Sequence, residues 1–310
     1  MEHTNQREAY GMTLVELGKV NRNIVILDAD LGGSTRGKLF EDSFPDRHVE
    51  MGIAEANMTS VAAGLAQTGK IPFVNTFAVF ASGRAYDQIR QTIAIGKLNV
   101  KICGSSAGVS DFGDGSTHQS VEDIAIMRAI PNMTVLCPAD ANETVKAVRA
   151  LAEYNGPCYI RLNRNDYPNV TSPDAPFEIG VPAVLKEGSD VVLFATGYML
   201  TLAMEAARQL EGRVSVKVVN ISTIKPLDQN RIKELVKGAR GVVTAEEHSV
   251  VGGLGSAIAE ALRLERMPVE FVGIQDCFGR SAHSYGDILK YQNLTTERVV
   301  EAIETIVSFQ

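Results

Sequence analysis

Short runs rich in β-branched residues alternate with longer stretches of helical period along this 310-residue chain, and this rhythm constrains its fold more than any other feature. Such alternation is typical of a parallel sheet whose connecting helices cover both faces. In the first half the runs are IVILD (24–28), IPFVNT (71–76), NVKICG (99–104), TVLCP (134–138) and CYIRL (158–162). The sequence therefore predicts an α/β fold.

A segment without period separates two such halves. Residues 165–182, NDYPNVTSPDAPFEIGVP, are rich in Pro, Asp and Asn, which is typical of a linker. The rhythm then resumes with runs at 189–197, 214–220, 240–247 and 268–274. We therefore expect two domains, each a mainly parallel sheet flanked by helices, over 1–170 and 187–310, joined by a linker over 171–186.

Charge and composition exclude several classes of function. The formal net charge is −7 and no basic stripe is present, so neither nucleic acid nor a membrane surface is expected as a partner. No apolar run approaches the ~20 residues of a membrane span, and the N-terminus lacks a leader pattern, so we expect a cytoplasmic protein. The four cysteines lack metal-ligand spacing and are expected to be buried reduced thiols.

Polar and aromatic residues follow several predicted strands at their carboxyl ends. In open parallel α/β sheets the ligand crevice lies outside these ends, because the loops there face one common edge. Four loops would bring to this edge Asp28, Asp30, Phe77, Phe80, the segment 105–120 and Arg164. We therefore expect a ligand site at this edge.

The loop SSAGVSDFGDGSTHQS, residues 105–120, exceeds the ~12–15 residues beyond which structureless connections become uncommon and are usually functional or disordered. Ser120, with Asp123 three residues later, is expected to cap the next helix and to hold Asp114 and His118 near a fixed helix end. A mobile Gly/Ser loop with an incidental histidine is the alternative that this segment leaves open.

The stretch VEMGIAEANM, residues 49–58, places one carboxylate at a predicted helix start. If the helix runs from about Ile53 to Ala66, Glu55 shares its apolar face with Met58 and Ala62. A carboxylate there needs a partner, because an unpaired buried charge is costly or shifts its pKa. The alternative is a first-turn glutamate that points to water and is favoured by the helix dipole. Periodicity does not decide between the two.

Two glycine motifs suggest phosphate or metal sites that their contexts disfavour. GDG at 113–115, followed by Asn142, is similar to a metal–diphosphate pattern, but Asp140 or Asn142 is better placed to cap a helix, so no metal site is expected. GGLGS at 252–256 could cradle a phosphate at a helix start. It lacks the preceding strand of a dinucleotide fingerprint, so a tight turn is expected instead.

Taken together, these segments resemble the C-terminal half of transketolase, a thiamine-diphosphate enzyme, from about Arg7 to the final helix. The segments that carry the resemblance are VEMGIAEANM, VNTFAVFASGRAYDQIR, FGDGSTHQSVEDIAIMRAIPNMTVLCPAD, GPCYIRLNR, NISTIKPLD and EEHSVVGGLGS. The resemblance implies a pyrimidine-binding domain followed by the smaller transketolase C-terminal domain.

The resemblance also implies roles at the cofactor. Glu55 matches the glutamate that hydrogen-bonds the ring nitrogen of the aminopyrimidine and promotes its imino tautomer, which takes the proton from the thiazolium C2 carbon. A carboxylate in an apolar wall suits this role, because its hydrogen bond is strong where water is excluded. Phe80 matches the aromatic residue that stacks on the pyrimidine, and Phe77 lies in the same wall. Asp30 matches an acidic residue near the cofactor and the sugar.

Further matches concern the substrate. His118 and Asp114 match groups that bind the sugar hydroxyls and assist proton transfers. Arg7, Ser34 and Arg164 match positions that grip the substrate phosphate, for which a permanently charged, bidentate guanidinium is apt.

Two positions depart from the family pattern. Ser106 stands where many transketolases have a histidine before AGVS, and Gly83 replaces an aromatic residue. Both positions belong to the implied sugar pocket, so the donor and acceptor sugars stay open.

The resemblance leaves out the N-terminal domain that binds the diphosphate through a divalent metal such as Mg²⁺. It therefore implies a split transketolase, in which a separate N-terminal subunit completes the site and the subunits form an α2β2-like assembly. The implied reaction is transfer of a two-carbon ketol unit from a ketose phosphate to an aldose or aldose phosphate.

Three other functions compete with this one. The β subunit of a 2-oxo-acid dehydrogenase E1 component shares the architecture, but DGSTHQ and a phosphate-gripping Arg164 argue against it. Deoxyxylulose-phosphate synthase shares THQ and IPNM but is one long chain. A non-catalytic α/β binding or electron-carrier module would leave Glu55 and His118 with structural roles only.

Overall fold

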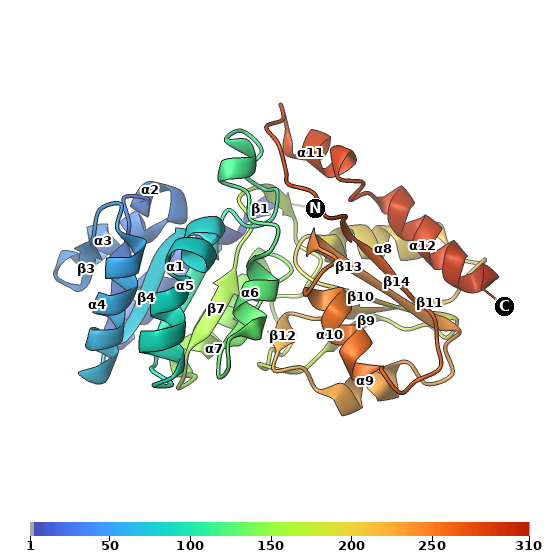
Figure 1. The fold of residues 1–310 in the computed structure, drawn as a ribbon, viewed down its shortest axis with the longest axis horizontal. Coiled ribbons are helices and arrows are strands. Elements are labelled where there is room, and N and C mark those ends of the chain that lie inside the picture. The colour runs from blue at the N-terminus through green and yellow to red at the C-terminus, as the bar shows by residue number, and fades with distance from the viewer. Residues whose placement is uncertain (1–2, 310) are drawn as a thin grey trace.

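A seven-stranded sheet with the order β12-β6-β7-β5-β4-β2-β3 organises the first half of the chain in this computed structural model, which describes residues 3–309 (Figure 1). Its strands are β2 (Ile24–Asp28), β3 (His48–Glu50), β4 (Ile71–Phe77), β5 (Lys101–Ser105), β6 (Thr134–Leu136), β7 (Cys158–Arg161) and β12 (Thr223–Lys225). Neighbouring strands pair in parallel, except that β12 runs antiparallel to β6. The five strands expected in this half are confirmed.

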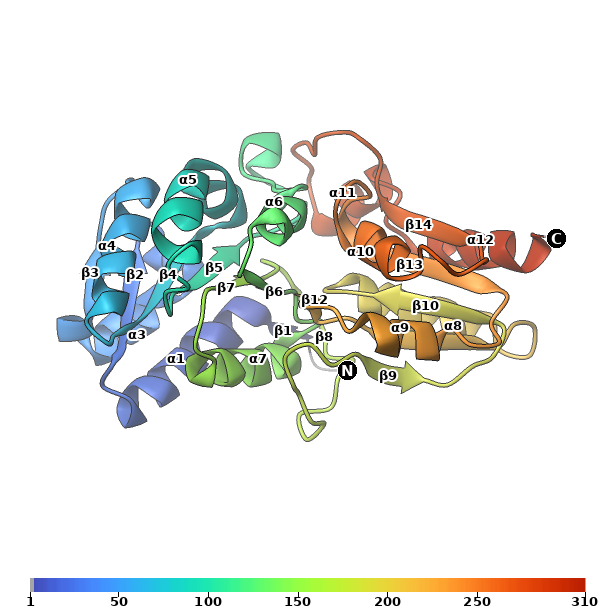
Figure 2. The same ribbon diagram turned by 60° about the horizontal axis from the view of Figure 1, so that its bottom comes forward.

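Helices cover both faces of this sheet, with α1 and α7 on one face and α4, α5 and α6 on the other (Figure 2). The α-helices are α1 (Gln6–Val20), α2 (Gly32–Thr35), α3 (Gly37–Ser43), α4 (Glu55–Gln67), α5 (Tyr86–Gln88), α6 (Asp123–Ala129) and α7 (Ala141–Glu153). Short 3-10 turns lie at η1 (Pro45–Arg47) and η4 (Gly115–Thr117), and π-helical turns at η2 (Phe80–Arg84) and η3 (Ile89–Ala94).

A five-stranded sheet with the order β14-β13-β10-β11-β9 forms the second half. Its strands are β9 (Ala183–Lys186), β10 (Val191–Ala195), β11 (Val216–Asn220), β13 (Gly241–Ser249) and β14 (Val269–Ile274), all parallel except β9. Its helices are α8 (Met199–Gln209), α9 (Gln229–Leu235), α10 (Leu254–Ala261), α11 (Tyr285–Tyr291) and α12 (Thr296–Ser308). The expected α/β fold with two mainly parallel sheets is confirmed.

The stretch between the two sheets is more ordered than a linker of its composition suggests. β8 (Asp166–Pro168) pairs antiparallel with β1 (His3–Asn5), and β9 lies inside the range 171–186 that was predicted as linker. These strands are three or four residues long and depend on distant partners, so no local period announces them. The domain limits at 170 and 187 stay a prediction.

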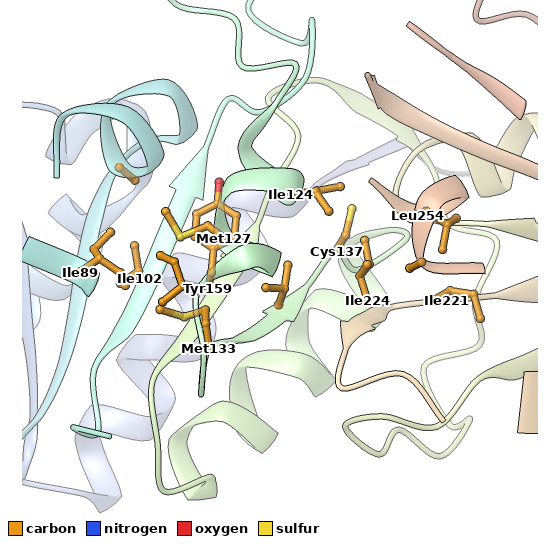
Figure 3. Packing of buried hydrophobic residues seen from close by; sticks show 14 of the residues in the cluster. Ile89, Ile102, Ile124, Met127, Met133, Cys137, Tyr159, Ile221, Ile224 and Leu254 are labelled. Carbon is orange, nitrogen blue, oxygen red and sulfur yellow. The ribbon is translucent and has the colours of Figure 1, made fainter. Parts of the chain in front are cut away.

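One apolar core runs across the junction of the two halves. Figure 3 shows Ile102, Met127 and Tyr159 from the first half in one continuous cluster with Ile224 and Leu254 from the second. β12 strengthens the junction, because it belongs to the second half in sequence but completes the first sheet. An apolar interface of this kind holds the two halves in one arrangement.

Buried polar groups add to the same junction. Arg161 forms a 2.9 Å ion pair with Asp123 and donates a 2.7 Å hydrogen bond to the backbone carbonyl of Glu247 in β13. Glu143 of α7 accepts hydrogen bonds from Asn220 and Ser222. Buried charges are retained where they are paired in this way.

The two helix-cap predictions have different outcomes. Asp140 caps α7 by accepting a hydrogen bond from the backbone N–H of Glu143, as expected. The prediction that Ser120 caps α6 is wrong, because that helix begins at Asp123 with Glu122 as its N-cap residue. Ser120 instead forms a backbone bridge to Gly108 that closes the long loop.

The cysteine prediction is correct for three of the four positions. Cys103, Cys137 and Cys158 are buried, and burial raises the pKa of each thiol. The prediction is wrong for Cys277, which is exposed after the last strand of the second sheet. Within residues 3–309, none of the helices combines the length and the apolar character that crossing a bilayer would require.

Candidate functional site

Glu55 is the first residue of α4, and its side chain is buried. The helix begins two residues later than expected, but Glu55, Met58 and Ala62 share one buried face as predicted. The alternative in which Glu55 points to water is therefore wrong. Its partner is Arg84, whose Nη1 lies 3.1 Å from Oε1 of Glu55.

An aromatic cluster lies beside this ion pair, at the carboxyl end of β4. Phe77 and Phe80 stack with their ring centroids 6.0 Å apart and an interplanar angle of 18°. The imidazole of His118 meets both rings edge-on, at centroid distances of 6.2 Å from Phe77 and 5.4 Å from Phe80. Edge-to-face contacts of this kind are favourable for aromatic rings. The structure thus brings together three predicted site residues from two segments.

The π-helical turn η2 connects the aromatic cluster to the ion pair. It begins at Phe80 and ends at Arg84, so both side chains lie on one side of the turn, and the guanidinium carbon of Arg84 is 4.3 Å from the Phe80 ring centroid. Arg84 therefore contacts Phe80 and Glu55 at once. Sequence reasoning missed Arg84, because its ion-pair partner Glu55 lies 29 positions earlier in the chain and no local period connects the two.

The long loop 105–120 is held in place from both halves of the molecule. The side chain of Gln119 donates hydrogen bonds to the backbone carbonyls of Asp111 and Arg280, at 3.0 and 3.1 Å. The N–H of Val109 donates to Oε1 of Glu247 at 2.8 Å. These contacts, and not a helix cap, fix the position of His118.

Three guanidinium groups gather at the same edge. Arg7 of α1 donates hydrogen bonds to the carbonyls of Ser34 and Arg164, at 2.8 and 2.9 Å, which joins all three residues predicted to grip a phosphate. Burial, with further contributions from Arg164 and Arg36, lowers the pKa of Arg7 to about 10. Guanidinium groups gathered at one edge suit an anionic ligand, and of these Arg36 also forms a 2.9 Å ion pair with Glu8. Arg36 was missed by the sequence analysis.

Asp111 is a further residue that the sequence analysis missed. Its carboxylate lies 2.5 Å from Nη1 of Arg164 and is buried. Burial raises the pKa of Asp111, the positive charge of Arg164 opposes that rise, and the nearby Asp114 adds to it. Arg164 also lies over Phe77, at 5.8 Å from the ring centroid, so it links the guanidinium groups to the aromatic cluster.

The remaining candidate positions differ in how exposed they are. Asp30 is exposed, with a φ of 58°, and its backbone N–H donates to Glu50. Asp114 is exposed, while Ser106 is fully buried at a φ of 53°, so a contact between Ser106 and a substrate stays a prediction. A Cβ added at Gly83 would meet no atom within 4 Å.

Asp28 has a structural position, unlike its neighbour Asp30. It is fully buried, accepts a 2.8 Å hydrogen bond from Thr35 and lies 2.9 Å from Nε2 of His48. This hydrogen bond raises the pKa of His48. Asp28 therefore anchors the loop that carries the exposed Asp30.

The helix starts associated with the two glycine motifs are occupied by protein groups. The start of α10, which follows GGLGS, is taken by the carboxylate of Glu246, which accepts hydrogen bonds from the N–H groups of Leu254 and Gly255 at 2.7 and 2.8 Å. Asn142 lies in the first turn of α7 and donates to the carbonyl of Thr171. Over residues 3–309, no three His, Cys, Asp or Glu side chains gather closely enough to hold a metal.

The fold and this edge define a two-sheet α/β protein with a buried carboxylate, an aromatic wall and a cluster of guanidinium groups at its ligand crevice. Residues 2–170 match the model of the transketolase pyrimidine-binding domain, and residues 180–299 match that of the transketolase C-terminal domain. The chain therefore belongs to the transketolase family. It corresponds to the C-terminal part of the enzyme, as a transketolase C-terminal subunit.

Curated relatives include chains of the same extent. A putative transketolase C-terminal section of Methanocaldococcus jannaschii is 45% identical over 97% of this chain and 96% of its own length. A 6-deoxy-6-sulfo-D-fructose transketolase subunit, SqwH of a Clostridium species, is 41% identical over 97% of this chain and 94% of its own length. The transketolase of Mus musculus is 35% identical, and the matched region covers 49% of the mouse protein.

Solved structures agree with this assignment. A split gene transketolase, described as an inactive beta4 tetramer, superposes with a TM-score of 0.89 at 48% identity and covers 98% of both chains. The transketolase of Campylobacter jejuni has the same fold, with a TM-score of 0.85 over 98% of this chain and 47% of its own. The family assignment therefore favours a transketolase subunit over the β subunit of a 2-oxo-acid dehydrogenase and over a non-catalytic binding module.

The residues present fit one end of the cofactor on which this family depends. Glu55 offers a buried carboxylate to a ring nitrogen, and Phe77 and Phe80 offer flat apolar surface to a heteroaromatic ring. A carboxylate and an aromatic wall recognise a pyrimidine and not a diphosphate.

Proposed function

We propose that this subunit forms the pyrimidine-binding half of a thiamine-diphosphate site, with Glu55 as its catalytic carboxylate. The observation that supports this most strongly is the burial of Glu55 on the apolar face of α4, next to the stacked Phe77 and Phe80. When bound, thiamine diphosphate supplies the electron sink for cleavage of a carbon–carbon bond. Glu55 would hold a proton between its carboxylate oxygen and the ring nitrogen of the pyrimidine.

The aromatic wall would orient the cofactor and exclude water. Phe80 would stack on the pyrimidine, while Phe77, fixed at the end of β4, would complete the wall behind it. Water-free surroundings strengthen the hydrogen bond that Glu55 makes. Asp30, exposed at the rim, would approach the cofactor and the sugar.

His118 would move protons to and from the sugar. Its Nδ1 lies 2.9 Å from Oγ1 of Thr117, so Nε2 is the nitrogen that remains for a substrate hydroxyl. Asp114, exposed in the same loop, would bind a second hydroxyl. A positioned histidine typically contributes ~10²–10⁴-fold to a proton transfer.

The far end of the sugar would lie at the guanidinium cluster. Arg7, Arg164 and Ser34 would grip an anionic group, and bidentate guanidinium contacts suit phosphate. The Clostridium relative acts on a 6-deoxy-6-sulfo sugar, and a relative from Phocaeicola vulgatus, 36% identical over 87% of this chain, is an apulose-4-phosphate transketolase subunit. We therefore propose sugars with an anionic end group, such as ketose and aldose phosphates, as substrates.

A separate N-terminal subunit would supply the rest of the site. It would hold the diphosphate through Mg²⁺ or another divalent cation, and the two kinds of chain would form an α2β2-like heterotetramer. The similar split gene transketolase is inactive as a β4 tetramer, which supports the expectation that this chain needs its partner. The cytoplasmic location stays a prediction.

Reconstitution of this chain with its N-terminal subunit tests the proposal. With thiamine diphosphate and Mg²⁺, the pair should transfer two-carbon units between sugar phosphates and should leave 2-oxo acids unchanged. This chain alone should show no turnover. Activity on 2-oxo acids without transfer between sugars would contradict the proposal.

A further inference from the structure

Arg84 contacts two residues of the candidate cofactor site at the same time, Glu55 and Phe80. Its Nη1 lies 3.1 Å from the carboxylate of Glu55, and its guanidinium carbon lies 4.3 Å from the centroid of the Phe80 ring. These two groups are the ones proposed above to bind the pyrimidine, the first by a hydrogen bond and the second by stacking. A single side chain of the same subunit therefore holds both.

The chemistry of the guanidinium explains this double contact. It is planar and delocalised over nitrogen and carbon, it stacks on aromatic faces, and it donates in-plane hydrogen bonds to carboxylates. An aminopyrimidine is also flat and also carries nitrogen at its edge. Glu55 and Phe80 can therefore contact either group. The guanidinium brings its own N–H to the carboxylate, whereas the ring nitrogen of the pyrimidine would share a proton with it.

Among the side chains around Glu55 and Phe80, Arg84 is the one that is free to rotate. Phe77 is buried at the end of β4, and His118 lies in the loop that is hydrogen-bonded from both halves of the molecule. The side chain of Arg84 is 54% exposed, whereas that of Glu55 is 5% exposed. Rotation of Arg84 into solvent would free Phe80 and Glu55 without disturbing the core.

We propose that Arg84 is a positioning residue that competes with the cofactor: the guanidinium and the aminopyrimidine are alternative partners of Glu55 and Phe80. This inference rests on the proposed function. Because only the fraction of molecules with Arg84 displaced can bind, the apparent affinity for the cofactor is reduced by that fraction. In return, Arg84 pairs the buried carboxylate of Glu55 when no cofactor is bound. This pairing stabilises the fold, because an unpaired buried charge is destabilising.

Calorimetric titration of the reconstituted two-subunit complex tests the competition. Thiamine diphosphate with Mg²⁺ is titrated into the wild-type complex, into Arg84→Gln and into the control Arg90→Gln, which changes an exposed arginine of the same segment. We expect Arg84→Gln to bind thiamine diphosphate about three- to tenfold more tightly, as loss of one exposed ion pair and cation–π contact implies, and Arg90→Gln to bind as wild type does. Unchanged or weaker binding by Arg84→Gln overturns the inference.

A second measurement uses this chain alone and does not depend on assembly. A double-mutant cycle with Glu55→Gln and Arg84→Gln, followed by urea unfolding, measures the coupling between the two side chains. We expect a coupling of about three- to tenfold in the unfolding equilibrium constant. Absence of coupling overturns the inference while leaving the proposed function intact. Failure of the wild-type complex to bind thiamine diphosphate would instead overturn the proposed function, and the competition with it.

Discussion

Glu55 and Glu246 are both buried glutamates beside the start of a helix, yet their partners differ. Glu246, in the second half, has both carboxylate oxygens bound by backbone N–H groups at the start of α10. Glu55, in the first half, faces the movable side chain of Arg84. A carboxylate held by backbone is part of the fold, whereas one held by a half-exposed side chain can exchange its partner for a ligand.

Glu55→Gln should have the largest effect. We expect turnover of the reconstituted complex to fall by ~10²-fold or more, because an amide cannot share a proton with the ring nitrogen as a carboxylate does. The free energy of unfolding should change by less than about 1 kcal/mol, since the ion pair with Arg84 is half-exposed.

Steady-state kinetics and urea unfolding measure the two effects of Glu55→Gln. Glu153→Gln, at the exposed end of α7, is the matched control and should retain wild-type turnover. If turnover of Glu55→Gln stays within a factor of a few of the control, Glu55 has no catalytic role and does not differ from the structural Glu246.

Glu246→Ala should act on stability. It leaves the N–H groups of Leu254 and Gly255 unpaired in a buried helix start and opens a cavity, so the free energy of unfolding should fall by about 2 to 4 kcal/mol. Urea unfolding of the chain alone measures this loss. A loss below about 1 kcal/mol would mean that Glu246 is no structural anchor.

The pH dependence of stability should report Glu246 as well. Burial raises its pKa to about 7 from an ordinary value of 4.5, although the two N–H groups oppose the rise. The folded chain then binds more protons than the unfolded chain between about pH 4.5 and 7. The contribution of Glu246 to stability therefore falls as the pH rises through this window, by about 3 kcal/mol.

The difference in unfolding free energy between wild type and Glu246→Gln isolates this contribution. This difference removes the contribution of His248, which is common to both proteins. Burial lowers the pKa of His248 from 6.5 to about 4, so its contribution to stability is lost as the pH falls below 6.5, which is the opposite trend to that of Glu246. The difference should decline from pH 4.5 to 7. A constant difference would contradict the assigned pKa shift.

Asp111→Asn should have the smallest effect. Without its carboxylate partner, Arg164 is freer to bind an anionic end group, so the KM for a sugar phosphate should fall about two- to fivefold, as expected for loss of one ion pair. Asp87→Asn, on the exposed side of α5, is the control and should leave the KM unchanged. A rise in KM for Asp111→Asn would show that Asp111 itself helps to bind the substrate.

The sequence predicted what local periodicity encodes. The nine expected strands follow from short runs of β-branched residues, and the face that Glu55 shares with Met58 and Ala62 follows from the helical period; both are confirmed. The sequence left open whether Glu55 is buried, and the structure decides that it is. The ion pair of Arg84 could not be predicted in this way, because its partner Glu55 lies 29 positions away in sequence. The pairing of Asp111 with Arg164, 53 positions later, depends on loop closure that no local pattern records.

The strands at the junction teach the same lesson. β12 has three residues, and its partner β6 lies far away in sequence, so nothing local separates it from the turns around it. β9 falls within the predicted linker because the stretch before it is rich in Pro, Asp and Asn and has no period. Short edge strands that depend on distant pairing therefore need the structure, while the central strands and the longer edge strand β14 do not.

A crystal structure of the two-subunit complex with thiamine diphosphate and Mg²⁺ tests the central claim most directly. Our account predicts that an oxygen of Glu55 lies within hydrogen-bond distance of the pyrimidine ring nitrogen, with Phe80 stacked on that ring and Arg84 turned away. A pyrimidine bound elsewhere, with Glu55 still paired to Arg84, would contradict it.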